Sequence, residues 1–394
     1  DRDRAMRLLF SATEGANFTY GRVPIGASDY AMDRYSLNEN AGDYAMEKFS
    51  IERDRKRLIP YIKAALAIKP GLRLWASPWT PPTWMKTGPF TANGVTGWDG
   101  GSMKDDPQVL KAHALYLAKF VEEYGKENIA IGTIHPQNEP GYETRYPSCL
   151  WTPALMNKFI GTYLGPTFAE RGVNAQIYLG TMSNNDSGKD GAIISTVLGD
   201  ATAMKYVKGC GLQWNMIDST ATCANKGLQV VQSEHKCGNY PWNPGGGLPP
   251  FNPDKAQNDY AYGVESWGYI RDWINKGVHV YSAWNMVLDT AGKNLDANRP
   301  WPQNALIIVD RATRTMTATA AYYVFRHASQ YVDVGAKRIE VSKGDALAFK
   351  NPDGTLVAVI HNTATSAKTT TVKIGGKTLQ FNVPANGFAT VNLP

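Results

Sequence analysis

Seven apolar segments alternate with segments of helical periodicity along most of this 394-residue chain. Strands of a parallel sheet that helices cover on both faces are apolar throughout, rather than alternating with polar residues. The pattern therefore predicts a parallel α/β fold and, at this length, a (β/α)8 TIM-type barrel. The predicted strands are Phe18–Gly26, Leu72–Pro78, Ile129–His135, Ala175–Met182, Cys210–Trp214, Leu228–Glu234 and His279–Met286.

The helices between these strands have recognisable ends. Asp106 is a side-chain cap, Pro107 fits the first helical position, and Gly125 ends the same helix. The short connection from Trp214 to Leu228 is expected to carry little or no helix. Further helices are predicted for Ser50–Lys69 with a kink at Pro60, for Thr152–Gly172 and for Asn258–Lys276.

The predicted strands number seven, whereas a closed barrel of this type has eight. Only a helix-like stretch, Asp1–Ser11, precedes the first of them. We therefore expect the first barrel strand to be missing from this chain or to lie upstream of its start.

The pattern of apolar and polar residues changes after Arg314. Thr315–Tyr331 is predicted to be the last barrel helix. Short alternating runs then follow, separated by turn signals at Asn351–Gly354 and Gly375–Gly376. This pattern predicts a barrel domain over residues 1–330 and a small antiparallel β-sandwich over residues 331–394. The expected strands are Arg338–Val341, Ala346–Phe349, Leu356–His361, Thr370–Ile374 and Phe388–Leu393.

Two glutamates follow predicted strands at the position that forms the active-site rim of a barrel. Glu139 lies in Asn138-Glu139-Pro140, and Glu234 ends the strand that begins at Leu228. Each could instead form a structural ion pair with a neighbouring Lys or Arg. Two facing carboxylates can carry out glycoside hydrolysis, and a separation of about 5–5.5 Å between them implies retained stereochemistry.

Charge and cysteine usage argue against several other functions. The net charge of +6 is modest, and acidic residues interrupt the basic cluster Arg53–Arg57, so we expect no nucleic-acid partner. No apolar run is long enough to span a membrane. The four cysteines form no CxxC pair and the six histidines show no metal-ligand spacing, so we expect no metal and no cofactor. Cys149 and Cys237 both follow rim glutamates and could approach each other.

Five segments in this order resemble glycoside hydrolase family 30, which includes lysosomal glucosylceramidase and microbial β-1,6-glucanases. The run Ala76-Ser77-Pro78-Trp79-Thr80-Pro81-Pro82-Thr83-Trp84 is highly specific. The segments are Arg22–Tyr30, Trp75–Thr87, Asn138–Pro140, Ser233–Glu234 and Ile307–Asp310, and together they span nearly the whole chain.

The resemblance implies a retaining β-glycosidase in which Glu139 is the acid/base and Glu234 the nucleophile. It implies that Asn138 holds the sugar 2-hydroxyl. The resemblance also implies further substrate-binding residues: Asp29 and Trp79 for hydroxyls of the −1 subsite, Trp284 as its wall, and Trp214. Asp29 and Trp79 also follow predicted strands at the same rim, so the residue pattern agrees with these assignments.

The chain departs from the family pattern in three places. The Gly-Phe-Gly-Gly stretch of the family's first strand is absent, and Gln213-Trp214-Asn215 stands where glucosylceramidase-like members have His-Trp-Tyr. His235 and Lys236 replace small residues after the nucleophile. This basic pair would favour the ionised form of Glu234, unless both side chains point away from it.

Long aromatic loops at the rim suggest the substrate. They contain Trp98, Trp242 and Trp301 and little Leu or Ile, which favours stacking on a polymer over an aliphatic entrance for a lipid. We therefore expect a β-glucan or other β-glucoside substrate and, by family analogy, an endo-β-1,6-glucanase that is secreted or periplasmic. The alternatives are an exo-acting β-glucosidase or glucosylceramidase, and a carbohydrate-binding protein with impaired catalysis.

Overall fold

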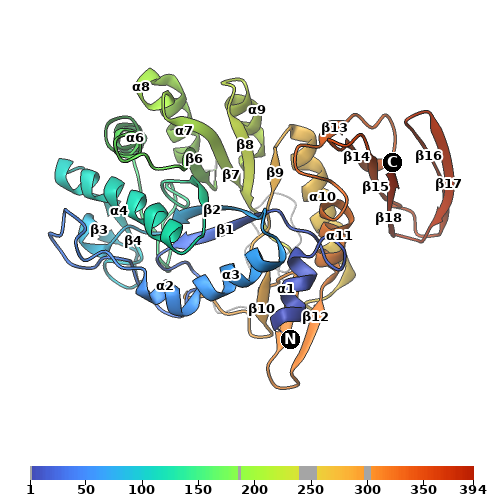
Figure 1. Ribbon diagram of the computed structural model, residues 1–394, viewed down its shortest axis with the longest axis horizontal. Helices are drawn as coiled ribbons and strands as arrows, with labels where there is room; N and C mark the ends of the chain where they lie inside the picture. The colour runs from blue at the N-terminus through green and yellow to red at the C-terminus, as the bar shows by residue number, and fades with distance from the viewer. Residues whose placement is uncertain (1, 185–187, 239–254, 297–302) are drawn as a thin grey trace.

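The computed structural model describes residues 2–184, 188–238, 255–296 and 303–394, and its centre is a seven-stranded parallel sheet (Figure 1). Neighbouring strands of this sheet follow one another in the chain, as the alternation of strands and helices predicts. All seven predicted strands are present in it. They are β1 (Tyr20–Ile25), β2 (Arg73–Pro78), β5 (Ile131–Ile134), β6 (Gln176–Met182), β7 (Val207–Gln213), β8 (Gln229–Glu234) and β9 (Val280–Tyr281).

The sheet is an open barrel with β1 and β9 at its edges. Among the described residues no strand pairs with the outer edge of either, which agrees with the count of seven. A hollow of about 1050 Å³ borders this opening at the amino ends of the strands, opposite the rim that carries Glu139 and Glu234. Phe18, Val280 and Phe325 are among the side chains that line it.

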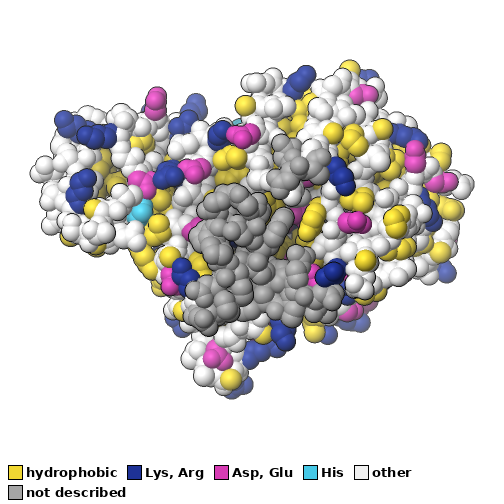
Figure 2. All heavy atoms as spheres, turned by 180° about the vertical axis from the view of Figure 1, so that it is seen from behind, with side chains coloured by type: hydrophobic (Ala, Val, Ile, Leu, Met, Phe, Trp, Pro, Cys, Tyr) yellow, Lys and Arg dark blue, Asp and Glu magenta, His cyan; other side chains and the backbone are white. Residues whose placement is uncertain are grey.

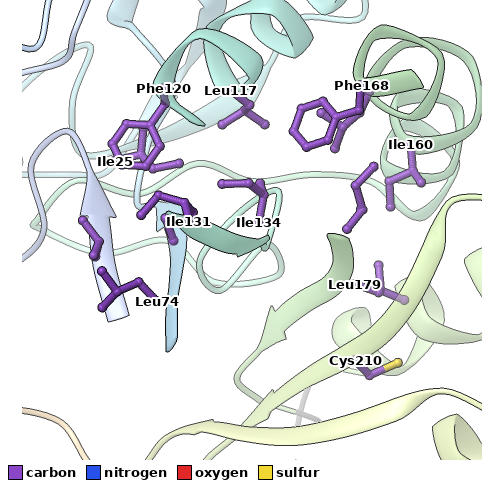
Figure 3. Packing of buried hydrophobic residues seen from close by; sticks show 14 of the residues in the cluster. Ile25, Leu74, Leu117, Phe120, Ile131, Ile134, Ile160, Phe168, Leu179 and Cys210 are labelled. Carbon is purple, nitrogen blue, oxygen red and sulfur yellow. The ribbon is translucent and has the colours of Figure 1, made fainter. Parts of the chain in front are cut away.

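Helix α4 (Pro107–Lys126) shows how the sequence builds the outer layer. The side chain of Asp106 accepts hydrogen bonds from the backbone N–H groups of Gln108 and Val109, which confirms the predicted cap. The helix turns its apolar stripe inward, where Leu117 and Phe120 belong to the same buried cluster as strand residues (Figure 3). The strand residues drawn with them include Ile25, Leu74, Ile131 and Ile134.

The other helices largely follow the predicted boundaries. The predicted helix Ser50–Lys69 is divided at Leu58, because Pro60 can only occupy the first turn of a new helix. The connection between β7 and β8 was expected to carry little or no helix, but most of it is helical, with a 3-10 turn (Met216–Asp218) followed by α9 (Ser219–Ala224). The remaining helices before residue 320 are α1 (Arg2–Phe10), α2 (Glu52–Arg57), α3 (Ile59–Ile68), the 3-10 turn Thr83–Met85, α5 (Pro153–Lys158), the π-helical turn Phe159–Leu164, α6 (Gly165–Arg171), α7 (Lys189–Gly199), α8 (Ala201–Met204) and α10 (Tyr260–Lys276).

The prediction of one helix over Thr315–Tyr331 was also wrong at its start. Thr315–Ala318 forms β12, which pairs antiparallel with β11 (Ile307–Asp310), and β11 pairs in turn with β10 (Val287–Asp289). The helix α11 (Ala320–Ser329) begins only after Thr319, whose hydroxyl accepts a hydrogen bond from Tyr322 N. The alternating threonines favour the strand because Thr is stiff at χ1 and suits a pleated surface. The predicted strand His279–Met286 is likewise shortened to the two residues of β9.

The C-terminal region is antiparallel, as expected. One sheet has the order β13 (Lys337–Ile339), β14 (Asp345–Lys350), β15 (Leu356–His361) and β18 (Phe388–Leu393). A separate hairpin joins β16 (Lys368–Ile374) to β17 (Lys377–Val383) through Gly375 and Gly376. The sequence prediction missed β17, although its alternation of polar and apolar residues was a usable signal. Asp345 fastens the sheet to α10, because it accepts hydrogen bonds from Trp267 and Arg271.

On the face seen in Figure 2, basic side chains of the described residues are distributed over several areas. Asp and Glu side chains lie between them. Within the described ranges, no helix combines the length and the apolar composition needed to cross a bilayer.

Candidate functional site

Glu139 and Glu234 both lie at the carboxyl ends of the sheet and are buried, with 8% and 7% of their surface exposed. Glu234 is the last residue of β8. Glu139 lies five residues after the end of β5, in a segment of bends whose backbone is fixed on both sides. Asn138 N donates to Pro78 O at 2.8 Å, and Glu139 N donates to Thr181 O at 2.9 Å. Glu139 has a left-handed φ of 50°, a strained conformation for a residue other than glycine, and such residues concentrate at functional sites.

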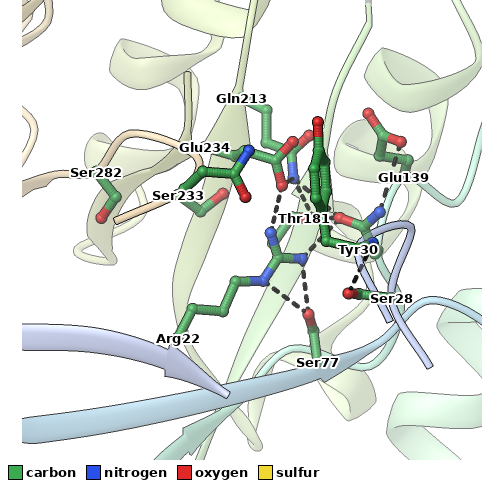
Figure 4. A network of polar contacts seen from close by, with 12 residues as sticks. Arg22, Ser28, Tyr30, Ser77, Glu139, Thr181, Gln213, Ser233, Glu234 and Ser282 are labelled. Atoms are coloured by element: carbon green, nitrogen blue, oxygen red, sulfur yellow. Dashed lines mark hydrogen bonds and ion pairs between the residues drawn. The ribbon is translucent and has the colours of Figure 1, made fainter. Parts of the chain in front are cut away.

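Arg22 of β1 links the two glutamates (Figure 4). Its guanidinium forms an ion pair with Glu234 Oε2, donates to Asn138 Oδ1 at 2.7 Å and donates to Ser77 Oγ at 2.8 Å. Asn138 Nδ2 lies 3.5 Å from Glu139 Oε2, which completes a chain of contacts from one carboxylate to the other. The guanidinium also lies over the ring of Trp79, 4.0 Å from its centre. A buried arginine needs such partners because an unpaired charge is expensive to remove from water.

The side chain of Asn138 is held in one orientation. Its Oδ1 accepts from Arg22, from Thr181 Oγ1 at 2.9 Å and from Gln213 Nε2 at 3.0 Å. The carbonyl side of the amide is therefore used by the protein, and its NH2 group faces Glu139. An NH2 group in that place can donate to a sugar hydroxyl, which is the role that the family resemblance implies for Asn138.

The two carboxyl groups have different electrostatic surroundings. Burial, together with the charges of Glu234 and Asp29, raises the pKa of Glu139 to about 8. Burial also raises the pKa of Glu234, but the charge of Arg22 and its hydrogen bond act in the opposite direction. Among the described residues a cation directly contacts Glu234 but not Glu139, so Glu139 is the carboxyl group that keeps its proton more readily.

The structure brings three further predicted residues to this site. Asp29 follows β1, and burial, with the charge of Glu234 second, raises its pKa to about 8. Its Oδ1 is buried without a hydrogen-bond partner among the described residues. The rings of Trp79 and Trp284 lie 5.4 Å apart beside Arg22, and Tyr30 meets Trp284 edge-on at 6.0 Å. Together they form an aromatic wall next to an acid that can bind hydroxyl groups.

Trp214 lies at the end of β7 with a left-handed φ of 37°. Its ring packs against that of His235 at 5.3 Å, and its role in binding substrate stays a prediction. The basic pair after Glu234 points away from the carboxylate. His235 packs on Tyr269 at 4.0 Å, and Lys236 forms an ion pair of 2.7 Å with Glu265 of α10. Arg22 therefore supplies the positive charge at Glu234.

All four cysteines are free, buried thiols, so the suggested pairing of Cys149 with Cys237 does not occur. The two lie in different surroundings, because Cys149 Sγ contacts Leu150 O and Cys237 Sγ contacts Trp284 O. In the part of the chain that the structure describes, no three His, Cys, Asp or Glu side chains are grouped to hold a metal ion. Two rim loops carry Trp242 and Trp301, and these residues lie outside the described ranges.

Sequence reasoning missed several residues of the site, among them Arg22, Gln213 and Tyr146. Arg22 is a charged residue within an otherwise apolar strand, and that exception was a signal, because a strand buried on both faces can hold a charge only beside a partner. Tyr146 donates to Glu139 Oε2 at 3.3 Å from the loop after β5. No local pattern marks Tyr146, because the loop's path sets its position.

Comparison with protein families gives two matches in succession. The "Glycosyl hydrolase family 30 TIM-barrel domain" matches residues 2–332. The "Glycosyl hydrolase family 30 beta sandwich domain" matches residues 335–391.

Individual relatives carry two kinds of name. "Putative glucosylceramidase 1" of Caenorhabditis elegans is 30% identical over 91% of this chain and 69% of its own length. "Endo-1,6-beta-D-glucanase neg1" of Aspergillus fumigatus is 24% identical over 96% of this chain and 78% of its own length. Among solved structures, "The endo-beta1,6-glucanase BT3312" superposes with a TM-score of 0.85 at 23% identity, over 99% of this chain and 86% of that one. At that identity the likeness shows the fold alone.

Proposed function

Because the chain belongs to glycoside hydrolase family 30, a family of retaining O-glycosidases, we propose that it cleaves β-glucosidic bonds by double displacement. Glu234 is the nucleophile and Glu139 the acid/base. The observation that carries this assignment is the direct pairing of Arg22 with Glu234, together with the absence of such a cation at Glu139 among the described residues. The pairing stabilises the ionised form of Glu234, as a nucleophile requires. Without such a cation, Glu139 keeps its proton more readily, as an acid requires.

In the first step a carboxylate oxygen of Glu234 attacks the anomeric carbon of the sugar. Glu139 gives its proton to the glycosidic oxygen as that bond breaks, and the leaving group departs as a neutral alcohol. Arg22 and Gln213 hold Glu234 Oε2, which fixes the carboxylate for attack. In the second step Glu139, now ionised, takes a proton from water. The water oxygen bonds to the anomeric carbon and Glu234 is released.

We propose β-1,6-glucan as the substrate, cleaved within the polymer. The support is the name of the fungal relative, the aromatic wall of Trp79 and Trp284, and the few Leu and Ile residues in the rim loops. A second candidate is exo-acting hydrolysis of a glucosyl lipid or small β-glucoside, and the putative glucosylceramidase of C. elegans favours it. Loss of catalysis in favour of sugar binding is the third possibility, and the presence of both glutamates argues against it.

Incubation with β-1,6-glucan tests the proposal, because the size of the products separates the candidates. We expect a ladder of short oligosaccharides that appears early, as cleavage within a polymer requires. Glucose as the sole product from the start would favour the exo-acting candidate. Failure of the folded protein to hydrolyse β-glucan, aryl β-glucosides or glucosylceramide would overturn the proposed activity, and the Glu234→Gln variant serves as the inactive control.

The pH dependence of kcat/KM follows from the raised pKa of Glu139. Glu139 must be protonated in the first step, so activity on substrates with poor leaving groups is expected to persist to about pH 8. Above that pH it should fall about tenfold per pH unit, because only the protonated fraction reacts. A rate profile measured on an alkyl β-glucoside checks this.

The control for this profile is Glu139→Gln on a dinitrophenyl β-glucoside, which needs no proton in the first step. That variant should lack the descending limb near pH 8. A wild-type limb that begins near pH 5 would contradict the assignment, because an acid with an ordinary carboxyl pKa would then be acting.

A further inference from the structure

Lys86 is a buried cation that the proposed reaction does not use. It begins β3 (Lys86–Phe90), exposes 4% of its surface and forms no ion pair among the described residues. Its ammonium donates to two backbone carbonyls, Ser148 O at 2.7 Å and Trp98 O at 2.9 Å. Burial lowers the pKa of Lys86 to about 8, so the charged form is kept at neutral pH at an appreciable energetic cost.

The two carbonyls belong to different segments. Trp98 precedes β4 (Gly100–Met103) of the hairpin formed with β3, whereas Ser148 lies in residues 141–150, hereafter the acid loop, which follow Glu139 and Pro140. Backbone hydrogen bonds already align the two segments: Ser148 N donates to Trp98 O, and Leu150 N donates to Gly101 O. The buried ammonium group of Lys86 lies between the two segments and donates a hydrogen bond to each of them.

A second charged contact supports the same loop. Arg34 forms a bidentate pair with the fully buried carboxylate of Asp99, at 2.8 and 2.7 Å. The same guanidinium donates to Arg145 O at 3.1 Å, one residue before Tyr146. The acid loop is therefore held on both sides of Tyr146, by Arg34 at residue 145 and by Lys86 at residue 148.

Tyr146 reaches from this loop to the catalytic carboxyl group. Its hydroxyl donates to Glu139 Oε2 at 3.3 Å, the oxygen that also lies 3.5 Å from Asn138 Nδ2. Burial, with the charge of Glu139 second, raises the pKa of Tyr146 well above its usual value, so the phenol keeps its proton and acts as a donor. An oxygen that accepts two hydrogen bonds is a poor site for a proton, which leaves Oε1 to carry it.

We propose that Tyr146 is a positioning residue for Glu139 and that Lys86 is the anchor that holds Tyr146 in place. The inference rests on the proposed function only in naming Glu139 as the acid/base. Tyr146 selects which oxygen of Glu139 is protonated, and it stabilises the ionised carboxylate that the second step requires. Lys86 acts through the backbone of the acid loop and never touches substrate.

Tyr146→Phe tests the first part of the inference, because it removes the hydroxyl and keeps the ring. Loss of a hydrogen bond to a charged group should lower kcat/KM about tenfold on an alkyl β-glucoside, which needs protonation, and far less on a dinitrophenyl β-glucoside. The pKa of Glu139 should rise, as read from the carboxyl resonance of ¹³C-labelled glutamate, assigned with Glu139→Gln. Tyr323→Phe, on the exposed face of α11, is the control.

Lys86→Met tests the second part, because methionine fills a similar volume without the charge. Hydrogen exchange of the acid loop should become about tenfold faster or more, and the pKa of Glu139 should move in the same direction as in Tyr146→Phe. Lys104→Met is the matched control. Lys104 also donates to a carbonyl beside this hairpin, Trp84 O at 2.8 Å, but that carbonyl lies outside the acid loop.

The outcomes separate this inference from the proposed function. Unchanged exchange of the acid loop in Lys86→Met would overturn the anchor. An unchanged pKa of Glu139 in Tyr146→Phe, with equal losses on both substrates, would overturn the positioning role. If the wild-type protein hydrolyses no β-glucoside while both variants shift the pKa of Glu139, the proposed function fails and the inference about the loop stands.

Discussion

Glu234→Gly is expected to abolish hydrolysis of β-glucosides, with a loss of about 10⁴-fold or more, because no covalent intermediate can form. Azide should restore turnover of an activated β-glucoside by entering the space that the side chain leaves. Since azide then attacks from the side of the nucleophile, the product should be the α-glycosyl azide. Nuclear magnetic resonance of the product identifies its configuration, and a β-glycosyl azide would overturn the assignment of Glu234.

Stability must be measured beside activity, because this change leaves Arg22 without its carboxylate partner. Removing one member of a buried ion pair typically destabilises a protein by about 3–5 kcal/mol. The matched control is Glu265→Gly, which removes the α10 partner of Lys236 and so breaks another buried ion pair without removing a group that contacts either catalytic glutamate. We expect the control to lose stability and keep its activity, so that chemical and structural losses can be told apart.

Glu139→Ala is expected to show a loss that depends on the leaving group. An alkyl β-glucoside requires protonation, and its kcat/KM should fall by about 10²–10⁴-fold, the usual contribution of general acid catalysis. A dinitrophenyl β-glucoside needs no proton, so its first step should be nearly unchanged while the second step becomes limiting. Azide should then accelerate turnover and give the β-glycosyl azide, because it attacks the glycosyl-enzyme from the side that Glu139 occupied.

The control for Glu139 is Glu143→Gln. Glu143 is an exposed residue of the acid loop, so its replacement tests whether any carboxylate of that loop contributes. Equal losses on both classes of substrate in Glu139→Ala would contradict the role of acid/base, because they would indicate a general disturbance of the site rather than a missing proton.

Much of the barrel could be predicted because its signals are local. Strands that are buried on both faces must be apolar along their length, and helix ends require caps, as Asp106 and Thr152 show. The errors occurred where tertiary contacts overrode local preference. Thr315–Ala318 is a strand only because Ile307–Asp310 lies beside it, and the backbone bonds of β12 exist only in that pairing.

The site was partly predictable for the same reason. The strand ends placed Glu139, Glu234, Asp29 and Trp79 at one rim, since parallel strands all end on the same side. The sequence also suggested that His235 and Lys236 could supply a positive charge to Glu234. The structure assigns that role to Arg22, because the chain after Glu234 turns both basic side chains toward α10.

By itself, the sequence determined the order of the seven strands of the parallel sheet, its lack of an eighth strand and the two carboxylates at its rim. The periodicity of burial and the ends of strands depend on residues that are close together in the sequence. Only the tertiary structure decided which carboxylate has a cation. Arg22 and Glu234 are 212 positions apart, and they meet because β1 and β8 point their side chains into the same interior. Contacts of that kind depend on the strand register and on the path of the whole chain, and no local sequence pattern predicts these.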